Sequence, residues 1–198
     1  MKICFSGSHR TGKTSLAERV AVENDFIMYY TEVSKTFKSK SVKEAERLEG
    51  IDGFYERLLI QQNINSAIKK CFGEGESYST FDRSPIDVYA YSEYFLGKIL
   101  SECSPKMEEI NAYNRHLEEI RETFEVVDYT FIVQPGINFE NVSSSCSEDL
   151  QEEMNDVFLN IVEAYVPKNK FTVVPRSMVD FEERVEFCSN ILKRNLRY

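Results

Sequence analysis

Eight residues near the N-terminus, from Gly7 to Thr14, have the spacing G-x-x-x-x-G-K-T. A loop of this composition can wrap its backbone N–H groups around phosphates, because the glycines let the ligand approach closely. Lys13 would then reach the outer phosphates of a nucleoside triphosphate, and the Thr14 hydroxyl would be placed for Mg²⁺. The apolar run from Ile3 to Phe5 and the helical pattern after Lys13 give the strand–loop–helix context that such a loop needs. The residues expected to bind the nucleotide are Gly7, Ser8, His9, Arg10, Thr11, Gly12, Lys13, Thr14 and Ser15.

A second candidate site follows the segment from Tyr78 to Phe81, which is predicted to be a strand and leads into Asp82 and Arg83. An acidic residue at the carboxyl end of a parallel strand faces the crevice where ligands bind in open α/β sheets. Asp82 could hold Mg²⁺ through water or accept the proton of an attacking hydroxyl, and Arg83 could contact substrate or a transferring phosphate. The alternative is that Asp82 caps the helix that Ser84 and Pro85 begin. The catalytic candidates are Lys13, Asp82 and Arg83, and the metal candidates are Thr14 and Asp82.

Polar residues in other segments could bind a second substrate. Glu32 follows the second predicted strand and could contact a sugar or base hydroxyl or act as a general base, but it could also be a solvated loop residue. Of Gln61 and Gln62, one is expected to face inward, where its amide could read a base edge, or both are ordinary surface residues. Arg115 and Arg121 could supply the positive charge of a lid, or could simply pair with neighbouring glutamates. The substrate-binding candidates are Glu32, Lys35, Gln62, Arg115 and Arg121.

Strands and helices are predicted to alternate along the chain. Strands are expected at residues 3–5, 26–30, 78–81, 126–133 and 171–174, and helices at 13–23, 54–71, 86–100, 105–122, 150–165 and 179–196. The strands are short and apolar rather than alternating, as expected where both faces of a parallel sheet are covered. This predicts an α/β fold of three layers, the P-loop NTPase fold, with a parallel five-stranded sheet flanked by helices. Residues 1–198 are expected to form a single domain, in which a lid or insert could lie around 101–125 and 138–149.

Composition narrows the class of protein. The chain has 198 residues, 42% of them hydrophobic, which suffices for one domain with a core, and its net formal charge is −9. An acidic protein is a poor partner for nucleic acid, although Lys35, Lys38, Lys40 and Lys43 form one basic stretch that leaves this partner open. The five cysteines are scattered and are expected to be free thiols in a reducing cytosol. No apolar run reaches the about 20 residues of a membrane helix, and there is no secretory signal pattern, so a cytoplasmic protein is expected.

Several of these features together resemble a known group. The phosphate loop, Glu32, the helix with Gln61 and Gln62, and the stretch D-R-S-P-I-D-V-Y-A-Y from Asp82 to Tyr91 are similar to the P-loop kinases related to nicotinamide-riboside kinase. Thymidylate and deoxynucleoside kinases are more distantly similar, and the resemblance spans about residues 1–175. It implies a nucleoside-monophosphate-kinase fold, ATP and Mg²⁺ as co-substrates, and Asp82 near the reacting hydroxyl or phosphate.

The sequence departs from that group at two places. In the group an arginine commonly follows the fourth strand in a lid, whereas the matching segment here, residues 140–145, contains no arginine or lysine. At Lys35 the group often has arginine instead. The resemblance therefore implies that a lid arginine would come from Arg115, from Arg121 or from a partner subunit.

Three functions remain to be weighed on this basis. A small-molecule kinase would transfer the γ-phosphate of ATP to a nucleoside, a nucleotide or a related acceptor. A regulatory NTPase is the second class, but the segment Asn169 to Thr172 lacks the aspartate of the guanine-reading N-K-x-D pattern. ATPase motors normally carry an Asp-Glu pair where this chain has Asp82 followed by Arg83, which favours the kinase. A kinase acting on a modified nucleic acid is the third, disfavoured by the net charge.

Overall fold

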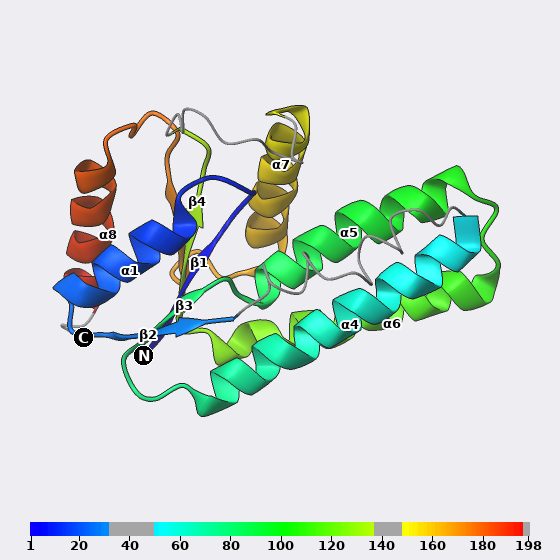
Figure 1. Cartoon of the computed structure of the whole chain (residues 1–198), viewed down its shortest axis with the longest axis horizontal. Coiled ribbons are helices and arrows are strands. Elements are labelled where there is room, and N and C mark those ends of the chain that lie inside the picture. The colour runs from blue at the N-terminus through cyan, green and yellow to red at the C-terminus, as the bar shows by residue number, and fades with distance from the viewer. Residues whose placement is uncertain (32–49, 137–147, 196–198) are drawn as a thin grey trace.

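The computed structural model describes residues 1–31, 50–136 and 148–195. Its described residues form a sheet of five parallel strands in the order β2-β3-β1-β4-β5 (Figure 1). The strands are β1 (Lys2–Ser6), β2 (Ile27–Tyr30), β3 (Ser79–Asp82), β4 (Tyr129–Val133) and β5 (Phe171–Val174). Because β1 is the central strand, the loop that follows it lies in the middle of the carboxyl edge of the sheet.

The connections between the strands are helical in the described part of the chain. The helices are α1 (Lys13–Glu23), α4 (Gly50–Glu74), α5 (Pro85–Glu102), α6 (Met107–Arg121), α7 (Glu148–Tyr165) and α8 (Phe181–Asn195), with a 3-10 helix, η1 (Glu122–Val126), before β4. This confirms the predicted three-layer α/β fold with its parallel five-stranded sheet. No helix among the described residues is both long and apolar enough to cross a bilayer.

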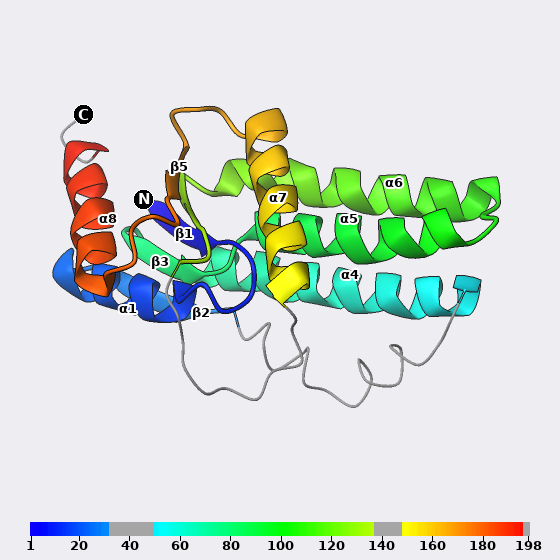
Figure 2. The same ribbon diagram turned by 90° about the horizontal axis from the view of Figure 1, so that it is seen from above.

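Each face of the sheet carries its own hydrophobic core. On one face, Ile3, Phe5 and Phe131 pack against α1 and α8. On the other face, Cys4 of β1, Phe81 of β3 and Ile132 of β4 pack against α4, α5 and α7. Successive residues of a strand point to opposite faces, so the central strands β3, β1 and β4 contribute apolar side chains to both cores. Figure 2 shows α1 and α8 on one side of the sheet and α7 with the long helices on the other.

Three long helices extend well beyond the sheet. α4, α5 and α6 lie side by side in both views and project away from the strands (Figures 1 and 2). Toward their ends far from the sheet they form a small core of their own, in which Phe54 and Leu58 of α4 meet Leu96 and Ile99 of α5. The segment 101–125, considered above as an insert, forms the end of α5, α6 and most of η1. Most of the second such segment, 138–149, lies outside the described residues.

Two sequence-based expectations for the strands differ from the structure. The fourth strand was expected to begin at residue 126, but Glu122–Val126 forms η1 and β4 begins at Tyr129, where pairing of Ile3 with Tyr129 begins the ladder to β1. The second strand was expected to be buried, but β2 is an edge strand, and its Ile27 and Tyr30 are exposed. The second difference arises from the order of the strands in the sheet, which local sequence does not specify.

Candidate active site

The phosphate loop joins β1 to α1 and depends on its two glycines. Gly7 has φ of 140°, and a Cβ at this position would lie 2.5 Å from the carbonyl oxygen of Val133 in the neighbouring strand. Gly12 has φ of 80° and directly precedes α1. Both residues therefore adopt a left-handed backbone that glycine permits without strain. The result is a loop that passes close to β4 and turns sharply into the N-terminus of a helix, where its N–H groups and the helix dipole favour an anion.

Lys13 lies buried against this loop. Its Nζ donates hydrogen bonds to the carbonyl oxygen of Ser8 at 2.5 Å and to Oγ1 of Thr11 at 3.4 Å. Burial and the nearby charge of Arg83 lower the pKa of Lys13 to about 7, although Asp87 and Asp82 oppose the shift. A phosphate bound in the loop would supply the negative charge that this ammonium group lacks.

Thr14 and Asp82 meet beside Lys13. The pairing of Phe5 with Asp82 in the β1–β3 ladder brings the end of β3 next to the start of the loop, and Oγ1 of Thr14 donates a 2.9 Å hydrogen bond to Oδ2 of Asp82. The other carboxylate oxygen, Oδ1, is buried and has no hydrogen-bond partner among the described residues. Mg²⁺ in nucleotide sites is held by one or two carboxylates or hydroxyls together with phosphates and water. This pair of oxygen-bearing side chains fits that requirement.

The turn after β3 shows which residue caps α5. The cap is Ser84, whose Oγ accepts from the N–H of Ile86 at 3.0 Å, while Asp87 accepts from the N–H of Ser84 at 2.8 Å. Asp82 is not the cap, so the structural alternative raised for it above is wrong. Ser84 is also anchored to β1, because its Oγ lies 2.7 Å from Oγ of Ser6. The cap thus fixes the direction in which α5 leaves the site.

Arg83 is held in this turn by a buried ion pair. Its φ is 88°, and its Nη1 lies 3.5 Å from Oδ1 of Asp87, with both side chains almost fully buried. Burial raises the pKa of Asp87, and the charge of Arg83 opposes that rise. The guanidinium also lies over the ring of Tyr91, 6.0 Å from its centroid, and the Tyr91 ring contacts the ring of His9 in the phosphate loop. Burial and the charges of Arg83 and Lys13 lower the pKa of His9 to about 4, so this ring is neutral near pH 7.

The predicted substrate-binding residues of the first half of the chain have different outcomes. Glu32 and Lys35 lie outside the described residues. Gln62 is exposed, whereas Gln61 is only 5% exposed, so Gln61 is the glutamine that faces inward. The amide oxygens of Gln61 and of Asn65, one turn further along α4, are both buried and have no hydrogen-bond partner among the described residues. Two unsatisfied acceptors on one helix face are the pattern expected where a ligand completes the bonds.

The two arginines proposed for a lid do not lie at the phosphate loop. Arg115 and Arg121 are exposed, and Arg121 pairs with Glu118 at 3.5 Å and lies over the ring of Tyr165. Arg121 is the last residue of α6. The chain then passes through η1 to the amino end of β4. This arginine therefore lies near the amino edge of the sheet, whereas the phosphate loop lies at the carboxyl edge. Arg121 therefore pairs with a neighbouring glutamate on an exposed helix face, as the alternative to a lid role predicts.

Two contacts to the loop come from residues that the sequence did not single out. Nε2 of Gln151, in α7, donates to the carbonyl oxygen of His9 at 2.6 Å. Nη1 of Arg184, in α8, donates to the carbonyl oxygen of Thr11 at 3.3 Å. These pairs are separated by 142 and 173 residues, so no local pattern could have found them.

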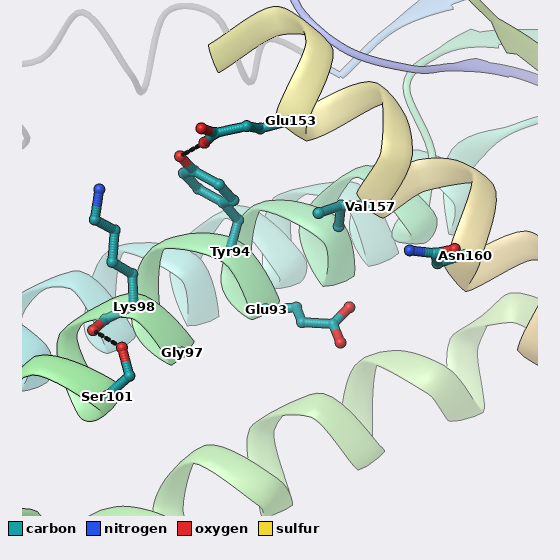
Figure 3. A pocket seen from close by; sticks show the side chains of 8 residues that line it. All are labelled: Glu93, Tyr94, Gly97, Lys98, Ser101, Glu153, Val157 and Asn160. Carbon is teal, nitrogen blue, oxygen red and sulfur yellow. Dashed lines mark hydrogen bonds between the residues drawn. The ribbon is translucent and has the colours of Figure 1, made fainter. Parts of the chain in front are cut away.

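Two hollows lined by described residues lie away from the loop. One, of about 450 Å³, lies between α5 and α7 (Figure 3) and is lined by Glu93, Tyr94, Gly97, Lys98, Ser101, Glu153, Val157 and Asn160. Figure 3 shows Tyr94 of α5 and Glu153 of α7 pointing toward each other across its rim, joined by a hydrogen bond. The other, of about 480 Å³, lies near the amino edge of the sheet and includes Arg121 and Tyr165. Neither is lined by a residue of the phosphate loop.

Comparison with known proteins agrees with this architecture. A model of the AAA domain family matches residues 2–184. No curated protein sequence matches the chain.

Three solved structures illustrate the similarity in fold. Deoxyadenosine kinase from M. mycoides with the products dCMP and dCDP bound is 17% identical with a TM-score of 0.68, covering 98% of this chain and 99% of that chain. The NadR protein in complex with NR is 15% identical with a TM-score of 0.58, and the match covers 98% of this chain and 48% of that chain. Thymidylate kinase from Candida albicans is 12% identical with a TM-score of 0.56, and the match covers 98% of this chain and 91% of that chain. These are the kinase groups that the sequence resembled, and the shared fold is that of P-loop kinases.

Proposed function

We propose that this chain, which belongs to the AAA domain family, is an ATP-dependent kinase that transfers the γ-phosphate of ATP to a nucleoside, a nucleotide or a related small acceptor. The observation that carries the proposal is the contact between Thr14 and Asp82 beside the buried Lys13, with one oxygen of Asp82 left unpartnered. This arrangement offers a cation for phosphates and oxygen ligands for a metal at one edge of the sheet. The family match alone would fit an ATPase equally well, so the choice of a kinase rests on the residues of the site.

The donor half of the site would consist of the residues from Gly7 to Ser15. The loop N–H groups and Lys13 would bind the phosphates of ATP, and Lys13 would neutralise charge on the outer phosphates. Thr14 and Asp82 would hold Mg²⁺, which neutralises charge on the phosphates when bound. Phosphoryl transfer needs little covalent chemistry from the protein, so positioning and positive charge account for most of the catalysis.

Arg83 would place positive charge at the transferring phosphate. It follows Asp82 directly, and its ion pair with Asp87 holds the guanidinium within the turn that faces the loop. Its positive charge helps to lower the pKa values of Lys13 and His9, which supports a position close to the phosphate loop. A polyphosphate would relieve the repulsion between Arg83 and protonated Lys13.

The acceptor half is proposed from α4. Gln61 and Asn65 present unpartnered amide oxygens, which accept hydrogen bonds from the N–H groups of a base. The similar structures named above are described as kinases of deoxyadenosine and thymidylate and as a complex with NR, all ligands that join a ring to a sugar. Glu32 and Lys35 remain candidates for the sugar or phosphate of such an acceptor. Nucleic acid is disfavoured as the acceptor because of the net charge of −9.

The place of this reaction would be the cytoplasm. Cys4, Cys71, Cys103 and Cys188 form no disulfide with one another among the described residues, which fits a reducing compartment.

A panel of acceptors tests the proposal. Nucleosides, nucleoside monophosphates, nicotinamide riboside and oligonucleotides are each incubated with γ-labelled ATP and Mg²⁺, and transfer of the label is measured. We expect transfer to at least one nucleoside or nucleotide, and loss of transfer in Lys13→Ala. Slow hydrolysis of ATP without transfer to any member of the panel would contradict the kinase and favour a regulatory NTPase.

A further inference from the structure

Arg184 is a charged side chain that the fold buries completely. It lies in the first turns of α8, its exposed fraction is 0%, and it is among the largest fully buried side chains of the molecule. No carboxylate of the described residues forms an ion pair with it. A buried, unpaired charge is costly, so a fold that keeps one usually derives a function from it.

The guanidinium is bound by backbone carbonyls from three separate segments. Nε donates to Met178 at 2.6 Å, and Nη1 donates to Gln134 at 3.2 Å and to Thr11 at 3.3 Å. Met178 lies between β5 and α8, Gln134 directly follows β4, and Thr11 belongs to the phosphate loop. One side chain thus ties the loop to the two segments beside it on the carboxyl edge of the sheet. Figures 1 and 2 show α8 next to α1, the helix that the loop begins.

The contact with Thr11 determines how one peptide group of the loop is oriented. In a planar trans peptide the C=O and the following N–H point in opposite directions, and the described chain contains no cis peptide bond. Because the carbonyl of Thr11 points at Arg184, the N–H of Gly12 points away from it. Lys13, the next residue, directs its Nζ to Ser8 and Thr11 across the loop. Arg184 therefore lies on the opposite side of this peptide from the N–H of Gly12, and we call this side the back of the loop.

The remaining nitrogen of the guanidinium, Nη2, is crowded and carries two unused N–H donors. Nη2 is buried and has no hydrogen-bond partner among the described residues. A Cβ on Gly136 would lie 2.5 Å from this atom, so the chain after β4 passes directly over it. The charge is therefore closely confined, and its hydrogen bonds to the described residues all go to backbone carbonyls. A charge in such surroundings acts over a longer distance than one in water.

We propose that Arg184 is a positioning residue for the phosphates of the donor nucleotide, which orients the Thr11–Gly12 peptide and contributes its buried positive charge from behind the loop. This rests on the proposed function in that the loop binds ATP. The charge contribution must grow with the negative charge of the ligand. A purely structural role for Arg184 would instead affect every ligand of the loop alike.

Two variants separate charge from packing. Arg184→Gln keeps N–H donors and removes the charge, and Arg184→Lys keeps the charge and loses the fork of donors. Ser189→Ala is the matched control, because Ser189 is 2% exposed on the same helix but contacts Asn24 and Glu23 at the far end of α1. Binding of ATP, ADP, AMP and adenosine is measured by calorimetry, and the fold of each variant is checked by thermal unfolding.

We expect Arg184→Gln to bind ATP about tenfold more weakly, with a smaller loss for ADP and AMP and none for adenosine. Arg184→Lys should stay within about threefold of the parent for ATP, and Ser189→Ala should bind all four ligands as the parent does. Unchanged ATP binding in Arg184→Gln, or an equal loss for adenosine and ATP, would overturn the proposal. If Arg184→Gln does not fold, the lysine variant decides: a folded Arg184→Lys with a tenfold loss for ATP contradicts the role of charge.

Measuring nucleotide binding also separates the test of Arg184 from the test of the proposed kinase activity. Binding is measured without an acceptor, so a chain that binds ATP but transfers no phosphate would contradict the proposed function and leave the Arg184 result intact. A parent chain that does not bind ATP at all would overturn both.

Discussion

Thr14 donates a 2.9 Å hydrogen bond from Oγ1 to Oδ2 of Asp82, which joins the first turn of α1 to the carboxyl end of β3 across 68 residues of sequence. The contact follows from the sheet, because β3 pairs with β1 and places Asp82 opposite Phe5, one residue before the end of β1. A hydroxyl and a carboxylate at hydrogen-bond distance, beside a buried lysine, are a ready site for a metal–phosphate complex.

Replacing the carboxylate should separate metal use from nucleotide binding. Asp82→Asn keeps the shape of the side chain but loses the charge, so we expect turnover with Mg²⁺ to fall on the order of a hundredfold or more, while metal-free ATP binding changes little. Turnover as a function of Mg²⁺ concentration is the measurement. Asp128→Asn is the control, because Asp128 is an exposed aspartate that accepts the N–H of Lys2 at the amino edge of the sheet. An Asp82→Asn enzyme with the parent's metal dependence would contradict the metal role.

The depressed pKa of Lys13 predicts proton uptake on binding ATP. A lysine with a pKa of about 7 is largely neutral at a pH of about 8, whereas phosphate binding favours its charged form. The free protein must therefore take up a proton, and ATP affinity should fall as pH rises above about 7. His9 does not contribute in this range, because its pKa is lowered to about 4.

Calorimetry in two buffers of different ionisation enthalpy measures that uptake directly. Lys13→Arg is the control, since arginine stays charged and should remove the pH dependence above neutrality even if it binds ATP more weakly. Lys13→Ala should abolish ATP binding and transfer. The absence of proton uptake at a pH of about 8 in the parent would show that Lys13 is already charged in the free loop.

The buried pair of Arg83 and Asp87 should be needed for stability as well as for activity. Asp87→Ala leaves Arg83 as an unpaired buried charge and removes half of the capping box of α5, so we expect a loss of about 3–5 kcal/mol in the free energy of unfolding. Denaturant unfolding measures this. The double variant Arg83→Met with Asp87→Leu should regain most of that stability and remain inactive, because no charge is then left uncompensated. A double variant with parent-like transfer would remove Arg83 from the catalytic proposal.

Local pattern was sufficient to predict much of this molecule. The strand–loop–helix unit around Lys13, the position of Asp82 at a strand end and the alternation of strands with helices all follow from neighbouring residues, whose periodicity and turn chemistry are local properties. Asp87 and Tyr91 were missed as site residues, although they lie four residues apart on α5 and therefore share one face of that helix, next to Arg83.

The rest depended on contacts between distant segments. The side chains of Gln61 and Gln62 point about 100° apart on the helix. The mixed polarity of α4 did not indicate which of the two faces inward. Arg121 lies away from the loop because α6 must return to the amino edge of the sheet to begin β4, and that follows from strand order. Arg184 reaches Thr11 only because α8 packs beside α1. Strand order and helix placement are global properties, so a single sequence did not show these contacts.

The close approach of Gly7 to β4 gives a prediction about the backbone. Gly7→Ala would place a Cβ 2.5 Å from the carbonyl oxygen of Val133 at a φ of 140°, so the loop must shift, and we expect ATP binding to fall at least about tenfold with a stability loss of about 1–3 kcal/mol. Gly73→Ala is the matched control, because Gly73 lies in α4 with nothing within 4 Å of an added Cβ. That change should leave binding unaltered and stabilise the helix by about 0.5–1 kcal/mol. Equal effects of the two substitutions on ATP binding would contradict the strained-loop explanation.

Adjacent glutamines on α4 provide an internal test of the acceptor site. Gln61 is buried with an unpartnered amide oxygen, and Gln62 is exposed, so the same substitution samples the inward and the outward face of one helix turn. We expect Gln61→Ala to raise KM for the acceptor about tenfold or more while KM for ATP stays near the parent value, because a lost hydrogen bond to a base costs about 1–3 kcal/mol. Gln62→Ala should change neither constant. The measurement is steady-state transfer with each substrate varied in turn, using the best acceptor of the panel. If Gln61→Ala lowers kcat and leaves acceptor KM unchanged, the amide does not bind the acceptor and α4 supports the site only by packing.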